Sequence, residues 1–239
     1  MADIIPLNRS RLHEKIVRQI QKRIFTGTIK PGEKLPPERE LAVSFQVNRA
    51  TIREALRKLE SLELLEIRHG DGVYTKDYLE SGNLELVRAL VYLEENDEPL
   101  LAILEVRRIL IPEMAFLAAE RCTETEIEDL RLIINSEEFS ILEKDLRVHL
   151  LIARASRNLF YAVLLNFFNQ IYRDLGHLYF NNPKNAERSE TFHWEILKAM
   201  ENRDAESAKK IMAEVLLYAE TSIREYLTRN PRGLNEAIY

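Results

Sequence analysis

The chain has 239 residues, with 34 lysines and arginines, 39 aspartates and glutamates and a formal charge of −5 at pH 7. Its 46% hydrophobic content, with only 7 glycines and 8 prolines, excludes a mainly disordered chain and fits two helix-rich domains. The single cysteine, Cys122, excludes an internal disulfide. No apolar stretch is long enough to span a membrane or to act as an export signal, so we expect a cytoplasmic protein without a membrane partner.

The charge is unevenly distributed along the chain. Residues 1–76 carry a net charge of +5, whereas residues 77–239 carry a net charge of −10. A basic segment attached to an acidic remainder is compatible with a polyanion as partner, although many ordinary domains show such an excess by chance. Nucleic acid is therefore one hypothesis for the N-terminal part.

The N-terminal part is predicted to contain three helices followed by two short strands. Apolar residues four apart over 10–26 predict an amphipathic helix, which Gly27 ends. A second, short helix is expected to end near Phe45, and Asn48 is a suitable N-cap for a third. Two short strands flank a glycine-rich turn within 65–75. This order predicts a winged helix-turn-helix over residues 1–76.

The third helix carries Arg49, Thr51 and Arg53 on the face opposite its apolar residues. A helix fits the major groove of DNA, and an arginine near its start can pair with guanine O6 and N7. The alternative is a small helical domain whose arginines only form a solvated face.

Three segments of the head together resemble the GntR superfamily of bacterial transcription regulators. They are GEKLPPERELA at 32–42, VNRATIREALRKL at 47–59 and GDGVY at 70–74. The resemblance implies contacts to bases or phosphates by Arg39, Arg49 and Arg53, a phosphate contact by Thr51, and a wing tip formed by His69 and Gly70. Ala50 stands where the family usually has serine, threonine or proline, which removes one potential hydroxyl contact.

The remainder of the chain is predicted to be helical throughout. After a linker at 77–82, the domain at 83–239 is expected to be an antiparallel bundle of about seven helices, so the fold class is mainly α. Their expected ranges are 82–95, 98–121, 124–136, 138–156, 158–181, 186–202 and 204–229.

This helical part resembles the C-terminal domain of the FadR subfamily. The sequence Glu105-Val106-Arg107 is similar to its Glu-x-Arg signature, and residues 153–158 are similar to its segment ending in Ser-x-Asn. The subfamily has two kinds of effector. One kind uses a divalent metal to hold a small organic acid, and the other is long-chain acyl-CoA bound without metal.

The metal alternative depends on Asp145, His149 and His193. Asp145 and His149 are four residues apart on one predicted helix and therefore share a face, and the resemblance places His193 as a third ligand. Carboxylate and imidazole suit zinc or a similar ion. Val215 occupies the place of the subgroup's fourth ligand, a histidine, and the Asp/His pair is equally explained as a structural hydrogen-bonded contact.

The acyl-CoA alternative depends on two other stretches. Residues 172–183 and 218–226 resemble the acyl-CoA-binding member of the subfamily, although Ala219 replaces a glycine and Tyr226 a tryptophan. The resemblance implies effector contacts by Tyr172, Tyr179, Tyr218, Ser222 and Tyr226, and Arg107 could meet a carboxylate or phosphate. The alternatives are that the apolar residues nearby form only the bundle core and that Arg107 pairs with Asp145 or Glu105.

We expect a homodimeric, non-enzymatic regulator that binds a palindromic operator in double-stranded DNA. Acyl-CoA is the favoured effector, with control of fatty-acid metabolism, and a metal-assisted organic acid is the alternative. Two rival hypotheses are a metalloenzyme built on the Asp145, His149 and His193 set, which lacks an evident general acid or nucleophile, and a protein-interaction module with a vestigial head.

Overall fold

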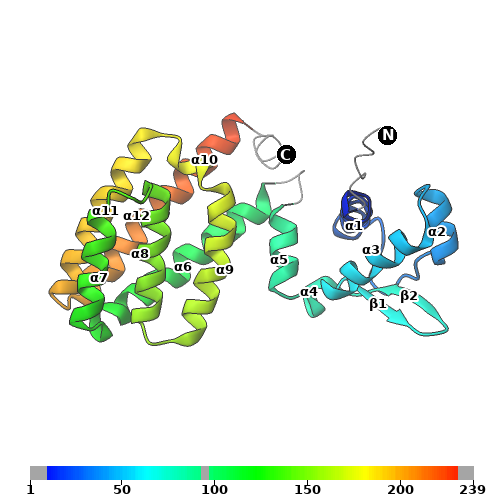
Figure 1. Cartoon of the computed structure of the whole chain (residues 1–239), viewed down its shortest axis with the longest axis horizontal. Coiled ribbons are helices and arrows are strands. Elements are labelled where there is room, and N and C mark those ends of the chain that lie inside the picture. Colours follow the sequence, from blue (N-terminus) through cyan, green and yellow to red (C-terminus); the bar gives the residue numbers. More distant parts are fainter. Residues whose placement is uncertain (1–9, 93–96, 231–239) are drawn as a thin grey trace, which may run out of the picture. The chain divides into compact units, whose positions relative to one another are not determined.

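A computed structural model describes residues 10–92 and 97–230 of the chain (Figure 1). The chain divides into two compact units, Met1–Leu93 and Glu94–Tyr239, which are described separately. The helix predicted over 82–95 includes residues 93–95, which lie outside the described residues.

The first unit contains the predicted winged helix-turn-helix. Its elements are α1 (Ser10–Phe25), α2 (Glu38–Ser44), α3 (Arg49–Ser61) and the antiparallel strands β1 (Leu65–Arg68) and β2 (Gly72–Thr75). Helix α1 packs against α3, and α2 packs against the other side of the same helix (Figure 1). The shared core is aliphatic and includes Ile16, Ile20, Leu41, Ile52, Leu56, Leu59 and Leu65.

Two further helices, α4 (Tyr78–Ser81) and α5 (Leu84–Val91), belong to the first unit. Residues 77–82, expected to be a linker, form α4 and its caps, and Ser81 Oγ donates a hydrogen bond to the carbonyl of Glu63 at 2.8 Å. Leu86 of α5 is 3% exposed and belongs to the core of the head. The segment is therefore held against the head by local capping and apolar burial.

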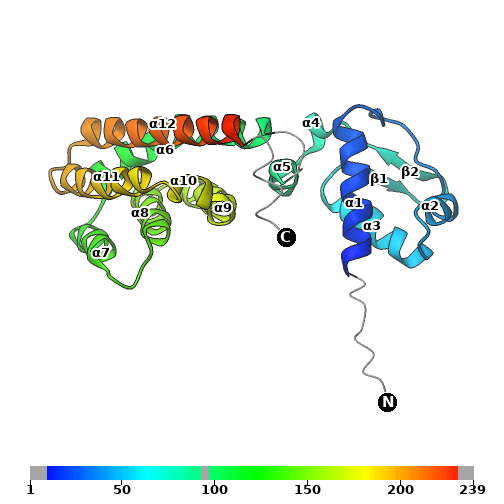
Figure 2. The ribbon, with the colours of Figure 1, turned by 90° about the horizontal axis from the view of Figure 1, so that it is seen from above.

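The second unit is all helical in its described residues. It contains α6 (Glu98–Arg121), α7 (Glu124–Asn135), α8 (Ile141–Ala155), α9 (Leu159–Leu175), α10 (His177–Phe180), α11 (Pro183–Glu201) and α12 (Ala205–Arg229). The long helices α6 and α12 lie side by side, and α8, α9 and α11 lie on one side of this pair (Figure 2). None of the described helices has the length and apolarity that a membrane span requires.

The mainly α fold is confirmed. The expected linker forms α4, the helix expected to open the bundle is α5 of the first unit, and a third expected helix is interrupted. The single helix expected over 158–181 is divided into α9 and α10 at Gly176. A Cβ at this position would lie 2.7 Å from both Leu142 Cδ1 and the carbonyl oxygen of Tyr172. Glycine therefore permits the close approach of α8 at the break.

The start of α7 allows a test of the second unit's stability. Thr123 Oγ1 accepts a hydrogen bond from the Glu126 amide at 3.2 Å, and Glu126 accepts one from the Thr123 amide at 2.9 Å. We expect Thr123→Ala to lower the free energy of unfolding by about 1 kcal/mol, because the first turn of α7 loses its cap.

Trp194 on α11 is the single tryptophan of the chain, and α11 packs against α7. Urea unfolding of the full chain, followed by Trp194 fluorescence, therefore reports on this unit. Thr221→Ala is the matched control, since the exposed Thr221 hydroxyl only donates to the Leu217 carbonyl of its own helix, α12. Equal unfolding midpoints for the two variants would contradict the role of the cap.

Candidate functional site

The start of α3 is held rigidly by its N-cap. Asn48 Oδ1 accepts hydrogen bonds from the Thr51 amide at 2.9 Å and from Thr51 Oγ1 at 3.1 Å. The preceding turn contains Gln46 with a φ of 53°, a left-handed conformation that reverses the chain between α2 and α3. The geometry of a helix-turn-helix is therefore present, with the N-terminal turn of α3 exposed.

The three arginines predicted to contact DNA all lie exposed on α2 and α3. Arg53 Nε donates to both carboxylate oxygens of Glu38, at 3.0 and 2.8 Å. Arg49 forms no ion pair with any residue that the structure describes. Arg49 is thus available to an incoming acceptor, whereas Arg53 must first exchange Glu38 for it.

The wing turn between β1 and β2 contains the exposed His69 and Gly70. Gly70 has a φ of 80° and Gly72 a φ of 155°, and a Cβ on Gly72 would lie 2.5 Å from Lys34 Cε. The turn therefore requires glycine at both positions, and its tip projects no bulky side chain from Gly70.

Three residues that sequence reasoning did not single out hold the wing. Lys34 Nζ donates to Asp71 Oδ1 at 2.9 Å, and the Tyr74 hydroxyl donates to Asp71 Oδ2 at 2.9 Å. These hydrogen bonds hold the pKa of Asp71 below its usual range. All three residues stand inside the family motifs, but the sequence contains no signal that pairs Lys34 with Asp71.

We expect Arg49→Ala to weaken operator binding and to relax the preference at one base pair by about 1–3 kcal/mol, since a bidentate base contact is lost. The measurement is a competition binding assay with single-base operator variants at two salt concentrations. Arg173→Ala, an exposed arginine on α9, is the control. Unchanged base preference in Arg49→Ala would assign the residue to another role.

The second unit encloses a small polar cavity of about 20 Å³. Six helices line it, and its walls combine charged, phenolic and aliphatic side chains: Leu104, Arg107, Asp145, His149, Tyr172, Tyr179, Ser189, Val215, Leu216 and Ala219. Such a volume accommodates about one water molecule. The cavity therefore holds no ligand larger than about one water molecule in this conformation.

Asp145 lies between two buried histidines. His149 Nδ1 donates to the Asp145 carbonyl at 2.9 Å, and His193 Nε2 lies 3.4 Å from Asp145 Oδ1. Burial alone would raise the pKa of Asp145, but His149, His193 and Arg107 outweigh it and lower this pKa. Burial lowers the pKa of His149, so the ring is neutral, with its proton on Nδ1. Its Nε2 is an acceptor without a partner among the described residues.

Arg107 is the cation of the cavity. It is 5% exposed, and its guanidinium carbon lies 4.3 Å from the centre of the Tyr172 ring. Its Nε is buried without a hydrogen-bond partner in the described part of the chain. A buried N–H donor of a cation and a buried imidazole acceptor therefore stand unsatisfied around one cavity.

The described side chains are not arranged as a ready-made metal site. No three histidine, cysteine, aspartate or glutamate side chains converge on a common point in residues 10–92 and 97–230. His193 Nε2 faces the Asp145 carboxylate instead, and the position of a fourth ligand is taken by the apolar Val215. A metal at Asp145, His149 and His193 stays a prediction.

The remaining predicted effector residues do not line this cavity. The Tyr218 hydroxyl donates to Asn185 Oδ1 at 3.2 Å, and Asn185 Nδ2 donates to Ser222 Oγ at 2.7 Å and to the Tyr179 carbonyl at 2.8 Å. This network joins α12 to α10 and α11. Tyr226 lies further along α12, half-buried and outside the cavity lining.

Two family matches and several relatives agree with this architecture. Residues 12–75 match the bacterial regulatory proteins, gntR family, and residues 102–217 match the FCD domain. The Uxu operon transcriptional regulator of Escherichia coli is 30% identical over 90% of this chain and 88% of its own. An Escherichia coli protein named for the L-lactate dehydrogenase operon is 28% identical over 95% of both chains.

A solved Listeria monocytogenes structure, described as Lar controlling the expression of the agr system, has the same fold. It is 16% identical, with a TM-score of 0.59 over 93% of this chain and 99% of that one. These families and relatives are transcriptional regulators and not enzymes.

Proposed function

From the premise that this chain belongs to the gntR family of DNA-binding transcription regulators, with an effector-binding FCD domain, we propose that its effector is a small organic acid. The observation that carries the proposal is that Arg107 Nε, His149 Nε2 and the Tyr179 hydroxyl are buried without a hydrogen-bond partner among the described residues, and all three residues line one cavity. A carboxylate would accept from the guanidinium, and a hydroxyl group on the same molecule would donate to the imidazole. A hydroxy acid presents both groups.

The name of one relative supports the same chemical class. That protein is named for an L-lactate dehydrogenase operon, and lactate is a small hydroxy acid. A site built to hydrogen-bond both groups would discriminate strongly against an acid lacking the hydroxyl, because His149 Nε2 would stay unpaired.

Effector entry would open the cavity and thereby shift a conformational equilibrium. The cavity wall includes Val215, Leu216 and Ala219 from α12, a helix that packs along the length of α6. A molecule larger than water must displace part of this wall. The effector therefore favours an open arrangement, with an expected coupling to DNA binding of about 1–3 kcal/mol.

Long-chain acyl-CoA, the effector favoured by sequence resemblance, gains less support. An acyl chain needs a long apolar channel, whereas Phe168, Ile171 and Tyr172 are buried around a second cavity of about 10 Å³. None of the relatives reported above is named for fatty acids or CoA.

The protein is proposed to bind a palindromic operator as a homodimer. One winged head reads one half-site, so a two-fold operator requires two heads. Size-exclusion chromatography with light scattering, with and without operator DNA, tests this assembly.

We expect Arg107→Met to weaken binding of L-lactate, or of whichever acid in a panel of hydroxy and dicarboxylic acids binds best, by at least about tenfold. Isothermal titration calorimetry on the full chain measures it. Arg108→Met is the matched control, since the neighbouring Arg108 pairs with Glu220 at 2.9 Å and does not line the cavity. Equal losses in both variants, or no binding by any acid, would overturn the proposal.

Chelator treatment separates the two effector alternatives. We expect organic-acid binding to survive removal of metal, because the described donors do not converge on an ion. Binding that returns only with added zinc, and is lost in His149→Ala, would favour the metal-assisted alternative. Micromolar binding of palmitoyl-CoA by the stripped protein would favour the acyl-CoA alternative instead.

A further inference from the structure

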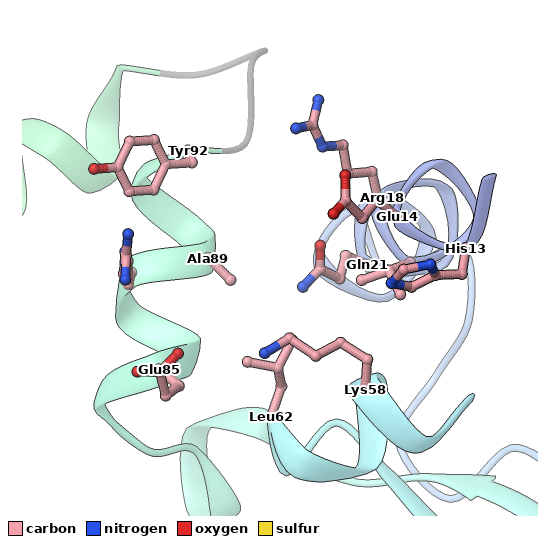
Figure 3. Close-up of a pocket in the computed structure, with 11 residues that line it drawn as sticks. His13, Glu14, Arg18, Gln21, Lys58, Leu62, Glu85, Ala89 and Tyr92 are labelled. Carbon is pink, nitrogen blue, oxygen red and sulfur yellow. The ribbon is translucent and has the colours of Figure 1, made fainter. Parts of the chain in front are cut away.

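The first unit contains a larger cavity that the proposed function does not use. Its volume is about 330 Å³, and it lies between α1, the C-terminal end of α3, and α5 (Figure 3). Volumes of this size are typical of pockets for small organic ligands. The interhelical cavity, as we name it, has eleven lining residues, all within the first unit.

Gln21 gives the interhelical cavity a polar group. The residue is 4% exposed, yet its amide has no hydrogen-bond partner among the described residues. Figure 3 shows this amide extending from α1 into the space that faces Ala89 of α5. An amide that faces a cavity and has no protein partner can bond to water or to a ligand there.

The cavity also contains a cation without a protein partner. Lys58, on the last turn of α3, forms no ion pair or hydrogen bond through its ammonium group within the described ranges. Arg18 and Arg88 add positive charge to the lining, and Glu14 and Glu85 add negative charge, so the net charge is positive. An anion is therefore favoured over a cation.

The rest of the wall is apolar. Val17 comes from α1, Leu62 directly follows α3, and Ala89 comes from α5. About ten water molecules would fill such a volume at liquid density, and those against aliphatic side chains would be poorly hydrogen-bonded. Replacing them with an apolar group is favourable.

We propose that the interhelical cavity binds a small carboxylic acid with an apolar body. Its carboxylate accepts from Lys58 Nζ and from the Gln21 amide N–H, and its apolar body lies between Leu62 and Ala89. Such a ligand joins α1 and α3 to α5, which follows the winged head in the chain.

This site is distinct from the surface proposed for DNA. Arg49 and Thr51 lie at the start of α3, whereas Lys58 and Leu62 lie at its end and directly after it. One rigid helix of 13 residues thus carries a base-reading end and a ligand-contacting end. Ligand and DNA therefore do not compete for the same side chains.

The test uses sodium benzoate and sodium hexanoate as probes with the full chain. Saturation-transfer NMR detects binding, and the shift of the Gln21 side-chain amide resonance locates it. We expect Ala89→Leu, which fills the cavity, and Gln21→Leu and Lys58→Met, which remove its polar contacts, each to weaken binding by at least about tenfold.

Two variants serve as controls. Lys30→Met removes an exposed lysine outside the cavity, and Arg107→Met removes the cation of the second unit, so binding is expected to persist in both. Circular dichroism checks that each variant folds. The Gln21 amide shift is measured in the unaltered protein, so it locates the ligand even if a variant fails to fold.

Failure of both probes to bind at about 10 mM would overturn the proposal. So would unchanged binding in Ala89→Leu, or binding that leaves the Gln21 amide resonance unmoved. Loss of binding in Arg107→Met alone would assign the acid to the second unit.

Discussion

The stability of the effector domain depends on how its buried charged side chains are compensated by their neighbours. Arg107 and Asp145 are each 5% exposed, and an isolated charge at such depth is costly. The cluster reduces this cost by placing a neutral imidazole and a second histidine beside the carboxylate and an aromatic ring beside the guanidinium. Arg107 Nε, His149 Nε2 and the Tyr179 hydroxyl stay without a partner among the described residues, and a ligand would complete them.

Val215 also determines which groups the cavity offers to a ligand. An aliphatic side chain at this point gives the cavity an apolar wall in place of another nitrogen donor. The Asp145 carboxylate lies 3.4 Å from His193 Nε2 and in the field of Arg107. Directional hydrogen bonds then decide which ligand fits, because the polar groups that remain are few and fixed.

The local parts of this structure were predictable from the sequence, and the parts that join distant segments were not. Asn48 as N-cap, the four-residue spacing of Asp145 and His149, and the hairpin around Gly70 all follow from patterns within a few residues. Lys34 and Asp71 are 37 residues apart, and no periodic pattern in the sequence indicates that they pair. The pattern of residues 158–181 predicts one helix through Gly176, and only the approach of Leu142 shows why glycine stands there.

Burial explains why cavities were the least predictable feature. Arg107 was recognised as a candidate anion contact, but the sequence could not show that its cavity is closed to anything larger than a water molecule. Gln21 lies on the buried face of α1, where an isolated polar residue among aliphatic ones gives no sign of a space in front of it. Only the packing of α5 against the head creates that space. A polar residue on an otherwise apolar helix face can therefore be identified as part of a cavity only when the position of the third helix, α5, is known.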